Sequence, residues 1–105
     1  MKKVLFVVMC LMVLGVTAQN AAQPDEFAYD HAIRWAIRGK AANPQSVSFS
    51  WNPPTYERIA PPVYERKYEI KIAGQTRYGY AKVQYKGGDP KDLNNWKVLK
   101  ATIDK

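Results

Sequence analysis

The chain has few of the residues that form disulfides, bind zinc or act in catalysis. Its 105 residues contain one cysteine and one histidine. One cysteine cannot form an internal disulfide, and together with one histidine it cannot complete a zinc site of protein ligands. The histidine, His31, follows Asp30 on the expected polar side of a helix, where a solvated surface role is typical. We therefore predict a protein that is not an enzyme and that holds no metal or cofactor.

Motifs that hold phosphates or nucleophiles are also missing. The chain contains no G-x-G-x-x-G, no P-loop and no G-x-S-x-G segment. Paired carboxylates across a groove would permit glycoside hydrolysis. However, Asp25 and Glu26 are expected at a helix start, and Asp89 and Asp92 lie in a polar turn. Both pairs therefore have structural explanations.

Long apolar runs are confined to the start of the chain. Lys2 and Lys3 precede an apolar run at residues 4–16, and the small residues of a signal-peptidase site follow it. A membrane span needs about 20 apolar residues, which is more than this run provides. We predict cleavage after Ala18, a periplasmic or secreted location, and no membrane span afterwards. Cys10 lies inside the apolar run, which disfavours lipidation.

The domain that remains after cleavage is poor in leucine and rich in aromatic residues. It has 87 residues, and the loss of two lysines lowers the formal net charge from +7 to +5. Two leucines remain, against three tryptophans and seven tyrosines. Each aromatic ring can bury about 150–250 Å², so we predict an aromatic core in one small domain at residues 19–105. The dispersed positive charge predicts weak attraction to anionic surfaces but no specific nucleic-acid binding.

One amphipathic helix is predicted at residues 24–38. Acidic residues lie in its first turn, and Gly39 follows its end. At the helical period the apolar side chains share one broad arc that can pack on a sheet. They are Ala28, Tyr29, Ala32, Ile33, Trp35, Ala36 and Ile37.

Alternating side chains predict strands after the helix. Val47, Phe49 and Trp51 alternate with serines, which predicts a half-buried strand at residues 47–51 with these three side chains inward. A last strand at residues 96–103 completes an antiparallel sheet of about four strands. We therefore predict the α+β class, with one N-terminal amphipathic helix packed on this sheet.

The clearest pattern is a hairpin formed by residues 64–73 and 76–86. Glycine at the first position of a two-residue loop predicts a type II′ turn that begins at Gly74. This register places Tyr64 opposite Tyr85.

One internal repeat interrupts these patterns. The sequence Pro-Pro-x-Tyr-Glu-Arg occurs at residues 53–58 and again at residues 61–66. We interpret the proline-rich segment at residues 52–62 as a stiff linker between two strands. The alternative is a ligand for domains that bind polyproline II peptides, which requires that the leader is retained and that the chain is not bacterial.

The outer face of the predicted sheet provides the candidate binding surface. Tyr78 and Tyr80 point outward along the hairpin, and Trp96 and Val98 join them if the last strand directs Leu99 inward. A register shifted by one residue would instead turn Trp96 and Val98 into the core. Tyrosine and tryptophan dominate binding hot spots. We therefore expect the partner to be another envelope or extracellular protein.

Three short motifs run through the domain: N-P-Q-S-V-S-F at residues 43–49, Y-G at residues 78–79 and W-K-V at residues 96–98. With the leader and the helix, they resemble small exported bacterial proteins of uncharacterised function. This resemblance implies the fold and the compartment but no activity. The segment Q-T-R-Y-G at residues 75–79 also resembles the Q-x-V-x-G hairpin of cystatins, with Arg77 in place of the central valine.

These observations favour an exported, non-enzymatic interaction module of the cell envelope. One alternative is a structural or accessory envelope protein without a discrete site. The cystatin resemblance implies a second alternative, a protease inhibitor.

Overall fold

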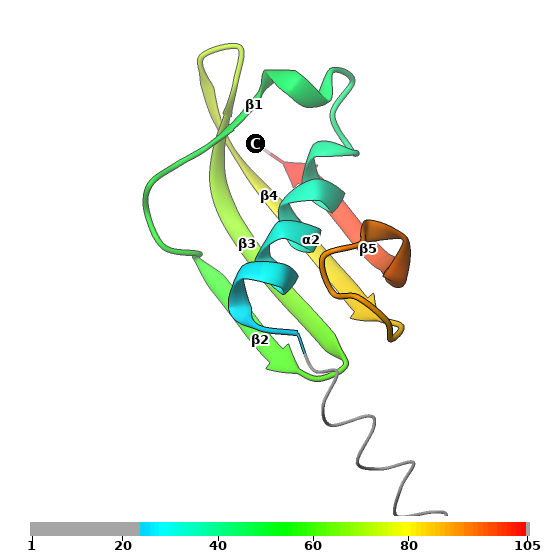
Figure 1. The fold of residues 1–105 in the computed structure, drawn as a ribbon. Helices are drawn as coiled ribbons and strands as arrows, with labels where there is room; N and C mark the ends of the chain where they lie inside the picture. Colours follow the sequence, from blue (N-terminus) through cyan, green and yellow to red (C-terminus); the bar gives the residue numbers. More distant parts are fainter. Residues whose placement is uncertain (1–23, 105) are drawn as a thin grey trace, which may run out of the picture.

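The computed structural model describes residues 24–104, in which one helix crosses one face of a five-stranded antiparallel sheet (Figure 1). The helix α2 (Glu26–Arg38) precedes every described strand. The strands are β1 (Val47–Phe49), β2 (Tyr56–Ala60), β3 (Val63–Ile72), β4 (Gln75–Tyr85) and β5 (Trp96–Asp104). Short 3-10 turns at Pro44–Ser46 and Leu93–Asn95 lead into β1 and β5. The predicted α+β class is confirmed, with five strands where about four were expected.

The predicted leader, its cleavage site and Cys10 lie outside the described residues. Between residues 24 and 104, no helix is both long enough and apolar enough to span a membrane.

The helix α2 is capped at its start and buries one narrow side. The carboxylate of Asp25 accepts a hydrogen bond of 3.0 Å from the backbone N–H of Ala28, which satisfies a free amide of the first turn. Trp35, which we expected on the buried side, is 42 % exposed. It follows Ile33 by two residues, which is about 200° around the helix. The buried side chains are Ala28, Ala32, Ile33, Ala36 and Ile37.

The strands β3 and β4 form the predicted hairpin with a different turn. The turn residues are Ala73 and Gly74, whose φ angles of 53° and 80° are both in the left-handed region that a type I′ turn requires. Tyr64 consequently faces Val83 instead of Tyr85, a register shift of two residues. Such a shift leaves every side chain on its predicted face of the sheet.

The proline-rich segment is not a linker, because it contains β2, which pairs with β3. The two copies of the repeat therefore pair with each other. Glu57 faces Arg66, and Arg58 faces Glu65. Proline is excluded from central strands but is accepted beside edge strands such as β2.

The segment between β1 and β2 leaves the edge of the sheet. Backbone hydrogen bonds to β3 are made on either side of it, by Ser50 and Thr55. Residues 51–54 lie between these anchors, in the loop that stands out at the left of Figure 1. Trp51 is fully exposed there. Its predicted inward orientation is wrong, because β1 ends before the alternation reaches it.

The strand β5 contains an irregularity that reverses part of its predicted orientation. Its register with β4 changes between Lys82 and Val83, where β5 has an extra residue, Leu99. Trp96 and Val98 precede this bulge and lie on the side of the sheet that faces α2. Trp96 is 4 % exposed. The prediction that it points outward is therefore wrong. The shifted register applies to the residues before the bulge, whereas after the bulge Ala101 lies opposite Ala81 and is buried, as the first register requires.

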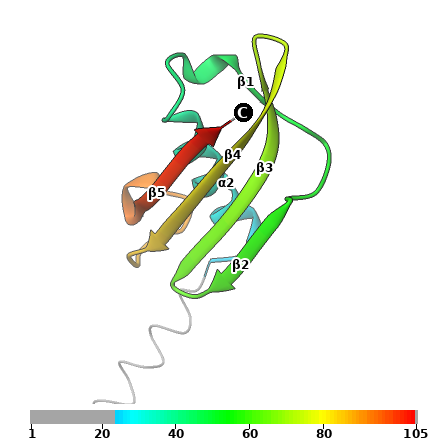
Figure 2. The ribbon, with the colours of Figure 1, turned by 180° about the vertical axis from the view of Figure 1, so that it is seen from behind.

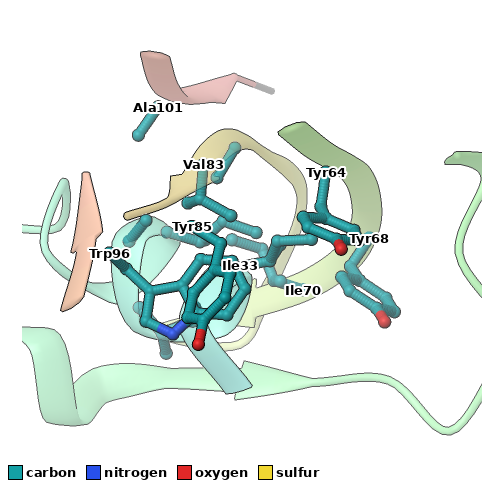
Figure 3. Close-up of a cluster of buried hydrophobic side chains, with 13 residues drawn as sticks. Ile33, Tyr64, Tyr68, Ile70, Val83, Tyr85, Trp96 and Ala101 are labelled. Carbon is teal, nitrogen blue, oxygen red and sulfur yellow. The ribbon is translucent and has the colours of Figure 1, made fainter. Parts of the chain in front are cut away.

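The core is aromatic only in part, because four of its thirteen buried residues are aromatic and the others are isoleucine, valine or alanine (Figure 3). The ring of Trp96 lies 5.7 Å from that of Tyr64 and 5.2 Å from that of Tyr85, between centroids. Tyr29 of α2 stacks on Tyr64 at 4.5 Å. The indole N–H of Trp96 donates to the carbonyl oxygen of Pro90 at 2.8 Å, so its polar group is satisfied. Rings thus supply part of the buried area that leucines would have given, and isoleucine and valine supply the rest.

Candidate functional site

The sheet face away from α2 is open to solvent. Figure 2 shows this face in front, with α2 behind the sheet. Because side chains alternate across a strand, residues paired in register share a face. Tyr56 of β2 and Lys67 of β3 therefore lie in one row with Tyr80 of β4, and Tyr78 follows Tyr80 on the same face. We define the surface formed by Tyr56, Lys67, Tyr78 and Tyr80 as the tyrosine face.

The side chains of the tyrosine face contact one another. The ring centroids of Tyr56 and Tyr80 are 6.5 Å apart, and the Nζ atom of Lys67 lies 5.7 Å from the ring centroid of Tyr78, within cation–π range. The hydroxyl of Tyr80 donates a hydrogen bond of 2.7 Å to Oε1 of Glu65. Burial and the neighbouring carboxylate raise the pKa of Tyr80 to about 12. This hydroxyl is therefore protonated and oriented at neutral pH.

The outward face has more cations than carboxylates. Among residues 24–104, register places on it the cations Arg58, Lys67, Lys71, Lys82, Lys97 and Lys100 and the carboxylates Glu65, Glu69 and Asp104. Glu65 is only 9 % exposed and is hydrogen-bonded by Tyr80. The charge that this face presents to solvent therefore favours an acidic partner surface.

The structure brings together two of the four predicted binding residues. Tyr78 and Tyr80 share the tyrosine face, whereas Trp96 belongs to the core and Val98 lies on the helix-facing side, 38 % exposed. Sequence reasoning missed Tyr56, because its segment was interpreted as a linker. The available signal was the repeat: two Tyr-Glu-Arg copies joined through a Pro-Pro turn can pair as a hairpin with Glu opposite Arg.

A charged cluster on the helix-facing side ties α2 to the sheet. Arg66 is 6 % exposed, and its guanidinium lies 2.7 Å from Glu26, 2.9 Å from Asp30 and 2.7 Å from Glu57. The hydroxyl of Tyr68 accepts from Arg66 at 2.9 Å and donates to Asp30. The buried cation is thus matched by carboxylates from both α2 and β2.

Asp30 is the central anion of this cluster. Burial alone would raise its pKa, but hydrogen bonds from Tyr68, Arg34 and Arg66 outweigh burial and lower the pKa. The carboxylate is therefore ionised at neutral pH. Its arrangement indicates a structural role, since each of these partners also packs between the helix and the sheet.

The other side chains that could act in catalysis or bind a metal ion are dispersed over the described part of the chain. His31 is exposed on α2, as expected for a surface side chain. Across the described part of the chain, no three His, Cys, Asp or Glu side chains are grouped so that they could hold a metal ion. Residues 75–79, which resemble the cystatin hairpin, lie within β4 and follow the turn at Ala73 and Gly74.

Comparison with known proteins found no family model, no curated protein and no solved structure that matches the chain. The functional proposal therefore depends on the geometry and charge of the surfaces described above.

Proposed function

We propose that the protein is an exported, non-enzymatic interaction module that binds an acidic surface of a partner protein in the cell envelope through the tyrosine face. The observation that supports this is the tyrosine face itself, whose residues lie by register on the side of the sheet that α2 does not cover. Figure 2 shows this side of the sheet in front of α2. Tyrosine suits such a role because its ring buries a large area and its hydroxyl forms hydrogen bonds. The surrounding cations favour an acidic partner and accelerate the encounter with it.

Tyr56 and Tyr78 are the residues to change first. Tyr56 is 45 % exposed and Tyr78 is half-buried, so both present ring surface to a partner. Tyr80 is less suitable, because its removal would deprive the buried carboxylate of Glu65 of a hydrogen bond and would disturb the fold.

The test compares partner capture from an envelope extract by the exported chain and by its variant Tyr56→Ser/Tyr78→Ser. The variant should capture at least about tenfold less partner. Its unfolding temperature should be unchanged. Phe27→Ser is the matched control, since Phe27 is 76 % exposed on α2, away from the tyrosine face. Capture should also weaken as salt rises. Equal capture by the wild type and the double variant would contradict the proposal.

Export is tested separately by the intact mass of the chain recovered outside the cytoplasm. The expected species begins at Gln19, which follows the predicted cleavage site. A recovered species that still begins at Met1 would contradict cleavage and would favour a membrane-anchored protein.

A further inference from the structure

A hollow of about 450 Å³ lies at the edge of the sheet where the chain leaves β1. Its volume is within the range of about 300–1,000 Å³ that is typical of small-molecule sites. It is bordered by Trp51 and Asn52 of the protruding loop, Ser48 and Phe49 of β1, and Glu69 and Lys71 of β3. We define this feature as the Trp51 hollow.

Trp51 provides one wall of the hollow and does not contribute to the core. The side chain has a relative exposure of 102 %, so folding buries none of its ring. The backbone of the loop around Trp51 is nevertheless restrained. The backbone N–H of Asn52 donates to the hydroxyl of Ser50 at 3.1 Å, and Pro53 and Pro54 restrict the backbone that follows. A flat aromatic ring on a restricted loop is a stacking surface available to a ligand.

Hydrogen-bonding groups line the rest of the hollow. Glu69 accepts one long bond of 3.4 Å from the side-chain amide of Asn52 and has further lone pairs. Lys71 is exposed and donates only, whereas the hydroxyl of Ser48 both donates and accepts. The single carboxylate and the single ammonium group of the lining cancel in charge. The lining therefore suits a neutral ligand with many hydroxyl groups.

We propose that the Trp51 hollow binds a neutral saccharide ring of an envelope or extracellular glycan. A pyranose ring has an apolar C–H face that stacks on an indole, and its rim of hydroxyl groups both donates and accepts hydrogen bonds. An aliphatic ligand would desolvate Glu69 and Lys71 without giving them partners. An anionic ligand would meet Glu69 without an excess of cations. A saccharide is thus the ligand class that suits both the aromatic ring and the polar lining. The hollow shares no residue with the tyrosine face, although Glu69 of its lining is paired with Tyr78.

The test is a titration of the exported chain with chitotetraose and with maltotetraose, followed by tryptophan fluorescence and calorimetry. At least one of these neutral oligosaccharides should bind and change the tryptophan emission. Trp51→Ala should raise its Kd about tenfold or more. Trp51→Phe should raise it less, because the phenyl ring keeps part of the stacking surface. Phe27→Ala, which removes another exposed aromatic ring, should leave the Kd unchanged.

Three outcomes would overturn the assignment. The first is no binding of either oligosaccharide at millimolar concentration. The second is binding that Trp51→Ala does not weaken. The third is a Trp51-dependent emission shift with anionic phospholipid vesicles and none with the sugars, which would identify a lipid surface instead. The variant Tyr56→Ser, which keeps the Tyr78 ring opposite Glu69, should bind sugar as the wild type does, so a failure of this proposal is distinguishable from a failure of partner capture.

Discussion

Glu57 and Arg66 face each other across β2 and β3 with their charged groups 2.7 Å apart, although they come from different copies of one repeat. The turn at Pro61 and Pro62 sets Ala60 opposite Val63, and this antiparallel register places the glutamate of each copy opposite the arginine of the other. The two resulting pairs lie on opposite sides of the sheet, since neighbouring residues of a strand alternate. Arg66 is consequently buried beneath α2, whereas Arg58 is exposed on the outward face.

This difference predicts unequal effects of the same substitution in the two copies. Arg66→Gln should lower the free energy of unfolding by about 2–3 kcal/mol, because it removes the buried cation that Glu57 and Asp30 share, although Asp30 keeps its ion pair with Arg34. The loss should stay below the roughly 3–5 kcal/mol of a fully buried pair, since Glu57 is partly exposed. Arg58→Gln should cost less than about 1 kcal/mol. Denaturant unfolding measures both, and similar losses would contradict the assigned roles.

The stabilising effect of Asp30 should disappear in acid. Burial would raise its pKa, but hydrogen bonds from Tyr68, Arg34 and Arg66 lower it in the folded chain. A lowered folded-state pKa adds stability above the unfolded value of about 3.9 and loses it as pH falls through the folded value. The wild type should therefore exceed Asp30→Asn in stability most at neutral pH, with a margin that shrinks below about pH 4.

Urea unfolding at several pH values measures this margin. Asp104→Asn, at an exposed position of β5, is the control and should show a small margin throughout. A margin for Asp30→Asn that stays constant across the acid range would count against the ionised, paired carboxylate.

Two tryptophans of the chain should differ sharply in their contribution to stability. Trp96 is 4 % exposed and contacts the rings of Tyr64 and Tyr85, whereas Trp51 is fully exposed. Trp96→Ala should lower the free energy of unfolding by about 3–5 kcal/mol. Trp51→Ala should change it by less than about 0.5 kcal/mol. Comparable losses in the two variants, measured by denaturant unfolding, would show that the last strand has another register.

Gly79 should not tolerate a side chain. A Cβ atom at this position would lie 2.5 Å from Cγ2 of Ile37, because the backbone of β4 closely approaches α2 there. Gly79→Ala should therefore destabilise the chain by about 1–3 kcal/mol through overpacking. Gly39→Ala is the matched control, since its nearest contact would be 3.5 Å and its φ of −64° suits alanine. Equal thermal stability of the two variants would be incompatible with this helix–sheet contact.

The spacing of apolar residues along the sequence was sufficient to predict the helix and the β3–β4 hairpin, because this spacing alone decides which side of each element is buried. The helix and the β3–β4 hairpin follow from periodicity and turn residues, and the faces of the hairpin were correct although the turn moved from Gly74–Gln75 to Ala73–Gly74. The faces stayed correct because the register changed by two residues, and a change of two residues preserves the direction of every side chain. The tyrosines of the hairpin were therefore assigned to the correct side.

The wrong predictions about the candidate binding surface concern the orientation of Trp96 and Val98 and the missed strand β2. The extra residue Leu99 turns Trp96 and Val98 to the opposite side of the sheet, and no local period distinguishes a strand with this bulge from one without it. The strand β2 depends on pairing with the second copy of its own repeat, which periodicity within the segment does not reveal. Both features involve contacts between strands, so half of the candidate binding surface could not be predicted correctly.

The hydrogen bond between Tyr80 and Glu65 can be tested by measuring the pKa of the Tyr80 hydroxyl. Burial, followed by this carboxylate, raises the pKa of Tyr80 to about 12. Because the folded-state pKa is raised, the stability linked to Tyr80 is complete below the ordinary tyrosine pKa of about 10. It is lost as pH rises through about 12. The phenol should thus resist ionisation longer than an exposed tyrosine.

Glu65→Gln should lower the pKa of Tyr80, because a neutral amide no longer opposes the phenolate charge. Ultraviolet titration measures it, with the step of Tyr80 identified by its loss in Tyr80→Phe. Glu69→Gln is the control, since Glu69 lies on the same face but opposite Tyr78. The pKa should remain above that of a free tyrosine in Glu65→Gln, because burial is the larger cause of the shift. An unchanged titration in Glu65→Gln would mean that the carboxylate does not bind this hydroxyl.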